Sequence, residues 1–345
     1  MRRSVLLNRT RRALRAFALI SLSLATGMAQ TGTSSMVSSA NAFLSTLDGQ
    51  QRNSVLFAYD DQKQRVRWSN LPVRAVPRAG LAMKDLNSAQ RSAAVALVSA
   101  ALSRRGFEKV QQIMDADQVL KTSSGNNPMF GTDLYYISIL GTPSEKDPWM
   151  LQFGGHHLAL NITVAGEHGV LTPTLTGAQP ALYIANGKTI RPLGRESDKA
   201  IALLNALDES QRKQAILGFR LADLVLGPGQ DGKTIQPEGL KASTMNEHQR
   251  AMLIDLMSEW ANIIHESSAA VRIAELKAGI NDTWFAWSGP TTVVPGHNLT
   301  AYYRIQGPNV VIEYAPQMLG GDPSLHVHTM YRDPTNDYGR KFASK

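Results

Sequence analysis

Residues 149–164, WMLQFGGHHLALNITV, form the longest run of strand-forming sequence in the chain and set its fold class. Aromatic, β-branched and leucine side chains dominate the run, as is typical of strands. Segments of similar composition lie at 134–140, 181–184, 283–287, 300–305, 310–314 and 325–330. Because Gly-Pro and Pro-Gly turns separate the later segments, the sequence predicts antiparallel strands there.

A second pattern recurs four times and marks helix starts. Each copy has Asp or Asn followed three positions later by Gln, which is a capping box: the first side chain accepts from an amide of the first turn, and Gln reaches back to the cap amide. The boxes run from Asp48 to Gln51, Asn87 to Gln90, Asp208 to Gln211 and Asn246 to Gln249. Their separations of 39, 121 and 38 residues argue against a solenoid, with a duplicated helical unit as the alternative.

Apolar residues at helical spacing follow the boxes. A stop at Gly106 ends the second helix, another helix is expected over 107–120, and the fourth is expected to reach Lys277. Helices and strands are grouped along the chain rather than alternating. This predicts an α+β fold in which the capped helices pack on a mainly antiparallel sheet.

The first 29 residues have the pattern of a secretory signal peptide. Six arginines precede an apolar run over 16–25, and Gly27-Met28-Ala29 supplies a small-residue cleavage site. The run is shorter than the roughly 18 apolar residues of a membrane span, and so is every later apolar stretch. We therefore expect an exported protein, periplasmic or secreted, with no membrane contact after cleavage. Residues 30–40 are expected to be a flexible tether, and 41–345 a single domain.

Charge and cysteine content exclude several functions. The chain has 36 basic and 28 acidic residues, but the signal carries six of the basic ones, so the mature charge falls from +8 to +2. No basic run interleaved with aromatic residues remains, so nucleic acid is not an expected partner. Because cysteine is absent, disulfides and thiolate ligands are excluded, and any metal must be held by nitrogen and oxygen.

Four of the eight histidines lie in two clusters, His156-His157 and His326-Val327-His328. Side chains alternate faces along a strand, so His326 and His328 point the same way and can share an ion. By the same rule His156 and His157 point to opposite faces, and only one of them joins that ion. The clusters predict a metal site with ligands from His326, His328 and one of His156 and His157, a number that suits a catalytic metal with one open position.

Few carboxylates lie near these clusters. Glu313 is the first candidate for a ligand or general base, because an acid on the apolar strand 310–314 is costly to bury unless it is paired or ligating. Asp333 and Asp337, just past the second cluster, are candidates to orient the imidazoles or take part in catalysis. The catalytic set expected from the sequence is thus Glu313, His157 and Asp333.

Two other interpretations of the clusters stay open. Strand histidines often serve only as hydrogen-bonding groups, and they can also act as acids or bases without a metal. Rival catalytic motifs are missing: there is no Gly-x-Ser-x-Gly elbow, no phosphate-binding loop and no dinucleotide fingerprint, and His265-Glu266 lacks the second histidine of a metalloprotease helix.

Both histidine motifs and several flanking segments resemble a known family. The segments are Tyr135-Tyr136, Pro148-Trp149, Gly154-Gly155-His156-His157-Leu158, Tyr303-Arg304-Ile305, and His326-Val327-His328 running on through Tyr331-Arg332-Asp333-Pro334 to Gly339. They resemble the secreted family catalogued as domain of unknown function 3500 (DUF3500) over most of the mature chain. The resemblance implies one large domain and a role for the two clusters, and it implies no particular activity.

The sequence as a whole predicts an exported metal-dependent enzyme. Hydrolysis by a metal-activated water is the first expectation, since a zinc-like ion needs no redox partner. A copper or iron oxidoreductase is the second, because nitrogen and oxygen ligands suit those metals as well. A non-catalytic periplasmic protein that binds a metal or another ligand is the third.

Overall fold

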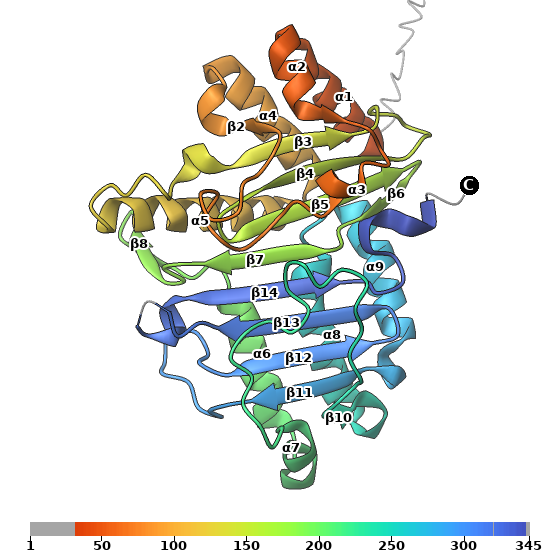
Figure 1. Cartoon of the computed structure of the whole chain (residues 1–345). Coiled ribbons are helices and arrows are strands. Elements are labelled where there is room, and N and C mark those ends of the chain that lie inside the picture. The colour runs from red at the N-terminus through yellow and green to blue at the C-terminus, as the bar shows by residue number, and fades with distance from the viewer. Residues whose placement is uncertain (1–31, 320, 343–345) are drawn as a thin grey trace, which may run out of the picture. The chain divides into compact units, whose positions relative to one another are not determined.

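The strand-rich segments come together in one long sheet with helices packed along it (Figure 1). The computed structural model describes residues 32–319 and 321–342, which belong to one compact unit. Every strand pair in the large sheet is antiparallel except that of β1 with β3. The α+β class predicted from the sequence is therefore confirmed.

The first half of the described chain contains helices and then a strand meander. Its helices are α1 (Gly32–Ser45), α2 (Gly49–Val55), α3 (Gln62–Arg65), α4 (Ser88–Ala101) and α5 (Arg104–Ser123). Its strands are β1 (Leu56–Phe57), β2 (Leu81–Ala82), β3 (Tyr136–Leu140), β4 (Trp149–Gly155), β5 (Leu158–Ala165), β6 (His168–Val170) and β7 (Thr174–Ala178). A small hairpin of β8 (Tyr183–Ala185) and β9 (Lys188–Ile190) follows.

The second half repeats this order. Its helices are α6 (Gly194–Ala206), α7 (Glu209–Ala215), α8 (Glu247–Ala261) and α9 (Glu266–Ala278). Its strands are β10 (Leu240–Lys241), β11 (Trp284–Ser288), β12 (Tyr302–Gly307), β13 (Val310–Pro316) and β14 (Val327–Arg332). Single-turn 3₁₀ helices lie at Met83–Asp85, Thr132–Leu134, Ala242–Thr244, Ile280–Asp282 and Pro323–Leu325, and a 3₁₀ segment spans Asp337–Phe342.

The sheet is arranged as two mirrored meanders that meet in its middle. The strand order is β1-β3-β4-β5-β7-β14-β13-β12-β11-β10, so β7 of the first half pairs with β14 of the second. At one edge β2 pairs antiparallel with β3, and at the other β10 pairs in the same way with β11. The duplication thus includes strands and is larger than the helical unit considered from the sequence.

All four predicted capping boxes are present, and they interlock in pairs. The side chains of Gln51 and Gln90 donate to each other's amide oxygen at 3.2 and 2.7 Å, and those of Gln211 and Gln249 do so at 3.1 and 2.8 Å. Each box therefore caps its own helix and also joins it to a neighbouring helix start. The first pair lies in one half and the second in the other.

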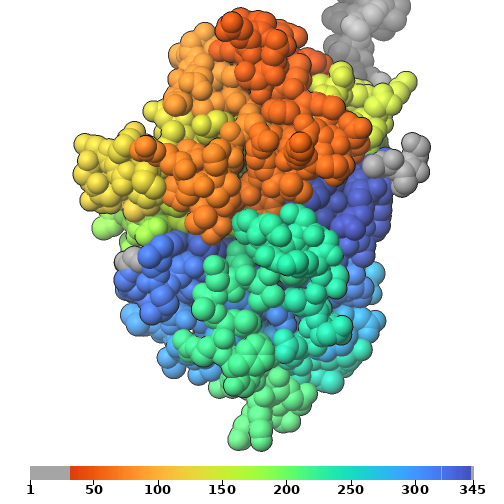
Figure 2. All heavy atoms as spheres, viewed as in Figure 1, coloured from red at the N-terminus to blue at the C-terminus, as the bar shows by residue number. Residues whose placement is uncertain are grey.

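The two faces of the sheet are covered differently (Figure 1). Helices cover one face, where the Trp260 indole of α8 donates to Thr329 of β14 at 3.0 Å. The long loops 58–80 and 217–239 cover much of the other face, as their orange and green atoms show in Figure 2. We call these segments the first and second cover loops. Because side chains alternate along β14, His328 faces the cover loops and Thr329 faces the helices.

Four sequence expectations need correction. The second capped helix ends at Ala101 rather than at Gly106, which lies within α5. Residues 32–40 belong to helix α1 rather than to a tether, because Met36, Ala40 and Phe43 recur at helical spacing and are buried. The fourth capped helix ends at Ala261, and α9 begins separately at Glu266. The central strand β7 was not predicted: its sequence TLTGA is short and buried on both faces, so it has no alternation to recognise.

The signal-peptide prediction lies outside the described residues. Within the described part of the chain, no helix is long and apolar enough to cross a membrane.

Candidate metal centre

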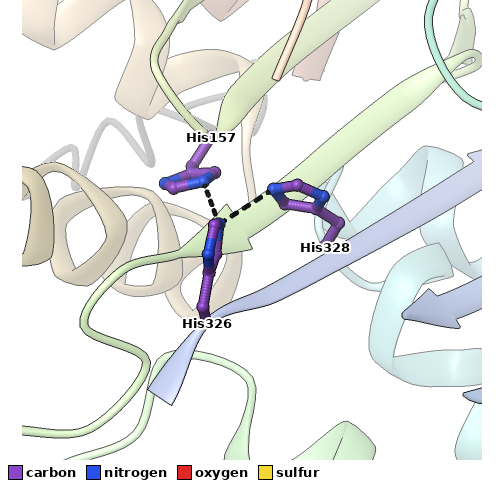
Figure 3. Close-up of side chains that lie close together, drawn as sticks. All are labelled: His157, His326 and His328. Atoms are coloured by element: carbon purple, nitrogen blue, oxygen red, sulfur yellow. Dashed lines mark hydrogen bonds between the residues drawn. The ribbon is translucent and has the colours of Figure 1, made fainter. Parts of the chain in front are cut away.

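The two histidine clusters lie beside each other at the junction of the two halves (Figure 3). His156 and His157 occupy the turn between β4 and β5, and His157 has a left-handed backbone with φ of +60°. His326 directly precedes β14 and His328 lies within it. The carbonyl of His157 accepts from the amide of Gly177 at 2.7 Å, and Gly177 is the register partner of His328, so β7 brings the clusters together.

Three imidazole nitrogens converge in this place. The Nε2 atom of His326 lies 3.0 Å from Nε2 of His157 and 3.2 Å from Nε2 of His328. Ligand atoms of the three residues all lie within 4.8 Å of one another. The residues are 2 %, 6 % and 4 % exposed for His157, His326 and His328, so little water reaches them. We call these residues the histidine triad.

The spacing of the triad fits a shared metal ion. Imidazole nitrogens about 2.05 Å from a tetrahedral ion lie about 3.3 Å apart, close to the distances between these atoms. The Nδ1–H of His326 donates to the Leu319 carbonyl at 2.8 Å, which leaves Nε2 with its lone pair. Lone pairs that face each other at this range repel unless a cation or a proton lies between them. The described residues can therefore bind a metal ion through His157, His326 and His328.

Electrostatics favour the neutral forms of His157 and His326. Burial lowers the pKa of His157 well below its usual 6.5, and the charges of His156, His328 and His326 lower it further. Burial also lowers the pKa of His326 to about 4, against the opposing effect of the Leu319 carbonyl. Neutral imidazole is the form that binds metals, so these two groups need lose no proton near neutral pH.

His156 lies behind the triad rather than in it. Its ring lies against that of His157, tilted by 30° with centroids 3.7 Å apart, and its Nδ1 lies 2.6 Å from Oδ1 of Asp117 on α5. The other oxygen of Asp117 accepts from the Gly131 amide at 2.8 Å. Of the two adjacent histidines, His157 is thus the one placed to be a ligand. The two residues form a hairpin turn and their rings are in contact, so they do not point to opposite faces of a strand as the sequence suggested.

Glu313 does not join the triad. Its Oε1 accepts from the Val225 amide and the Tyr302 hydroxyl, each at 2.7 Å, and its Oε2 accepts from the Leu226 amide at 2.8 Å. Burial raises its pKa above 4.5, although these three hydrogen bonds lower it. The buried acid predicted to be a ligand or general base is instead satisfied by amides and a hydroxyl, and it anchors the second cover loop.

Asp333 and Asp337 also lie away from the triad. Asp333 accepts from the amide and hydroxyl of Thr335 and lies 3.3 Å from Nη1 of Arg272. Together with Arg272 it lines a cavity of about 230 Å³ between β14 and α9. Asp337 forms a buried ion pair with Arg332 at 2.9 Å. The prediction that either carboxylate orients a ligand imidazole is therefore wrong, since each already has partners elsewhere.

Several residues of the site were missed from the sequence. Asp223 of the second cover loop lies 3.5 Å from Nδ1 of His328, and Asn70 of the first cover loop lies 3.4 Å from the same atom. Burial raises the pKa of Asp223, but His328, the Leu224 amide and Gln317 lower it below 3.8 overall. Neither loop residue has a sequence pattern that marks it.

Asp117 did leave a signal in the sequence. It falls on the buried face of α5 with Val110 and Ile113, so it is an acid at a position where the helical period expects an apolar residue. A buried acid of this kind needs a partner, and that partner is His156.

Fold and site together define a class of protein: an α+β domain built on one duplicated sheet, with a buried trio of imidazoles where its halves join. The chain belongs to the family described as "Protein of unknown function (DUF3500)", whose sequence model matches residues 29–340. The family suggested by the histidine motifs is thereby confirmed over nearly the whole chain. No curated protein and no solved structure matches the chain significantly.

Proposed function

We propose that this protein is an exported metal-dependent enzyme, most simply a hydrolase, whose ion is held by His157, His326 and His328. The observation that carries the proposal is the convergence of three buried Nε2 atoms at distances suited to one ion. Structural histidines are usually satisfied by hydrogen bonds to carbonyls or carboxylates. Here the Nε2 atoms face one another instead, and only the Nδ1 atoms of His326 and His328 face a carbonyl or a carboxylate.

The residues around the triad orient the three ligands in different ways. The Leu319 carbonyl fixes the tautomer of His326, and the turn at Gly155–Leu158 presents His157 across β7. His156 and Asp117 hold the ring of His157 from behind through a ring contact and a buried hydrogen bond. A bound ion would supply Lewis acidity and a nucleophilic water at neutral pH. Asp223, with its side chain 57 % exposed, is a carboxylate that lies 3.5 Å from Nδ1 of His328.

Zinc is the metal we propose first, since three histidines with an open position are a common zinc arrangement in enzymes and zinc needs no redox partner. The same nitrogen set suits copper or iron, and this keeps an oxidoreductase as the alternative. A non-catalytic metal carrier is favoured by one observation, the burial of all three ligands, because a substrate reaches the ion only if the loops above it move. The signal-like residues 1–29 support export.

Metal analysis of the purified protein tests the proposal. The wild type should hold about one transition-metal ion per chain, and the double variant His326→Ala, His328→Ala should hold none. His248→Ala, which removes an exposed histidine at the start of α8, is the matched control and should keep the ion. If neither the wild type nor the double variant contains metal after incubation with zinc, copper and iron, the metal site is contradicted.

Spectra and assays then separate the three functions. A zinc protein is colourless, whereas copper or iron gives bands in the visible range. Hydrolysis of an ester, amide or glycoside panel that is lost in the double variant supports the hydrolase. Reduction and reoxidation of a coloured ion in the presence of an electron donor supports the oxidoreductase, and tight binding with neither activity supports the carrier.

A further inference from the structure

Asp223 is a carboxylate of the second cover loop that lies beside His328 of the triad. Its Oδ1 lies 3.5 Å from Nδ1 of His328, the nitrogen opposite the one that faces His326. The same oxygen accepts from the Leu224 amide at 2.7 Å and from Nε2 of Gln317 at 2.9 Å. Histidines that bind metals commonly donate their outer N–H to a carboxylate or carbonyl, which fixes the ring.

The outer nitrogens of two triad members thus face groups from two different loops. Nδ1 of His326 donates to Leu319, and Nδ1 of His328 faces Asp223 at 3.5 Å, with the side-chain amide of Asn70 beside it at 3.4 Å. Gln317 joins these loops directly through its hydrogen bond to Asp223. Leu319 and Met318 beside it are 80 % and 72 % exposed, so little else packs on this loop. The described segments 221–224 and 317–319 therefore meet above the triad.

The second cover loop is fixed on both sides of Asp223. On one side the Leu221 amide donates to Ser288 at 3.0 Å. On the other, Glu313 accepts from the amides of Val225 and Leu226. Between these anchors Asp223 is exposed over more than half of its side chain, and it contacts Gln317, His328 and the neighbouring Leu224 amide. A short span of the loop thus contacts the site through one side chain.

We propose that Asp223 is a positioning residue of the metal site, and that it links metal binding to closure of residues 221–224 and 317–319 over the triad. The inference rests on the proposed metal site. The carboxylate accepts the Nδ1–H of His328 and so directs Nε2 toward the ion. Once His328 is held by an ion, its ring is fixed, the contact at 3.5 Å shortens, and both segments close. Without the ion His328 can turn away from Asp223, and the hydrogen bond of Gln317 to Asp223 is left to hold the two segments together.

Cobalt(II) and zinc titrations of the full chain test the positioning role. Asp223→Asn should weaken binding about 10–100-fold, as loss of a partner behind a ligand usually does. It should also shift the visible cobalt bands, because the orientation of His328 changes, and Asp223→Glu should restore part of both. Asp231→Asn is the matched control, since Asp231 ties the same loop to Arg332 and Tyr338 and, within the described residues, forms no hydrogen bond or ion pair with a histidine. It should leave the cobalt spectrum unchanged.

Hydrogen exchange tests the link to the loops. Zinc should slow exchange of residues 221–224 and 317–319 in the wild type, and this slowing should disappear in Asp223→Asn at a zinc concentration that saturates the variant. Unchanged affinity, spectrum and exchange in Asp223→Asn would overturn the inference, and so would an equal effect of Asp231→Asn. If the wild type binds no metal at all, the proposed metal site itself falls. If it binds metal through the histidines and Asp223→Asn behaves as the wild type, only the present inference falls.

Discussion

At the scale of single residues, Gly177 makes the triad possible. It lies opposite His328 on β7, and a β-carbon placed there would meet the Val327 carbonyl at 2.8 Å. The same atom would lie 3.3 Å from the Cδ2 atoms of both His157 and His328. Because Gly177 has no side chain, the rings of His157 and His328 can extend into the space that a β-carbon would fill. Glycine is needed at this position for space and not for backbone conformation, because Gly177 is not among the glycines with a positive φ.

Gly177→Ala should weaken metal binding about tenfold or more and lower the free energy of unfolding by about 1–3 kcal/mol, as overpacking of a dense site does. Gly49→Ala is the control, because a β-carbon there meets nothing within 4 Å and the position opens helix α2. It should leave binding unchanged and keep or slightly raise stability. Zinc titration and urea unfolding measure both quantities. Full affinity in Gly177→Ala would mean that the rings do not need this space.

Glu313 gives a pH dependence whose sign follows from its burial. Its pKa in the folded protein is raised above the 4.5 of the free group, so from pH 4.5 upward the folded state binds more protons than the unfolded state. The free energy of unfolding then falls as pH rises through this window. Glutamine resembles the protonated acid and cannot ionise. The fall between pH 4.5 and pH 7 should therefore be smaller in Glu313→Gln than in the wild type.

Urea unfolding at pH 4.5, 5.5 and 7 measures this difference. If the free energy of unfolding changes equally with pH in the two proteins, the ionised carboxylate is as stable in the fold as in water. Its hydrogen bonds with Tyr302, Val225 and Leu226 would then fully offset the cost of burial.

At the scale of elements, the interlocked capping boxes join helix starts within each half. Gln249 is 3 % exposed and donates both to the Ala206 carbonyl and to Gln211, while Gln211 donates to the Thr244 carbonyl and to Gln249. Each glutamine also accepts from its own cap amide. Removing one of them takes a hydrogen bond from both the Nε2 and the Oε1 of the other, and in the buried Gln249 this costs more than the loss of one exposed hydrogen bond.

Gln211→Ala and Gln249→Ala should each lower the free energy of unfolding by about 1–3 kcal/mol. The double variant should lose less than the sum, with a coupling of about 0.5–3 kcal/mol, because the second substitution removes the group that the first left unsatisfied. Gln51→Ala with Gln249→Ala pairs positions from different halves and should be additive within about 0.5 kcal/mol. Additivity of Gln211 and Gln249 would show that the two boxes act independently.

The elements that could be predicted from the sequence are those set by local contacts. A capping box is complete within four residues, so the sequence predicts it. Strands such as 310–314 consist of β-branched and aromatic residues, so their composition alone predicts them. Strand β7 depends on neighbours on both sides, and helix α1 was hidden because its polar residues outweigh the spacing of Met36, Ala40 and Phe43. These elements are defined by what packs against them rather than by their own pattern.

The same distinction applies to the site. His326 and His328 were paired correctly because strand alternation is local. Choosing His157 over His156 required the hairpin turn and the distant Asp117. Glu313 was recognised as a buried acid with a necessary partner, but the sequence does not show that the partners are loop amides. Asp223 acts across about a hundred residues from His328, and nothing local marks it.

At the scale of the whole molecule, the duplication explains the spacing of the boxes. The separations of 39 and 38 residues lie within the halves, and 121 lies between them. The halves pair through β7 and β14, and this junction also divides the triad: His157 comes from the first half, and His326 and His328 from the second. An ion bound there would connect the halves across the middle of the sheet.

This arrangement predicts how the ion stabilises the protein. Unfolding of either half destroys the site, so bound metal should protect both halves against any opening that separates the ligands. At a free zinc concentration 1,000 times the dissociation constant, the free energy of unfolding should rise by about 4 kcal/mol. Exchange of the slow amides of β5 in the first half and β13 in the second should slow by comparable factors.

There are two controls. One is the double variant His326→Ala, His328→Ala, and the other is the hairpin of β8 and β9. The variant should show no zinc effect in either half. The hairpin pairs only with itself, so local opening of residues 183–190 leaves all three ligands in place, and its exchange should not change with zinc. Protection confined to β13 and β14 would mean that the ion is held by the second half alone, through His326 and His328. That result would mean that His157 is not a ligand, since His157 is the ligand through which the ion stabilises β5.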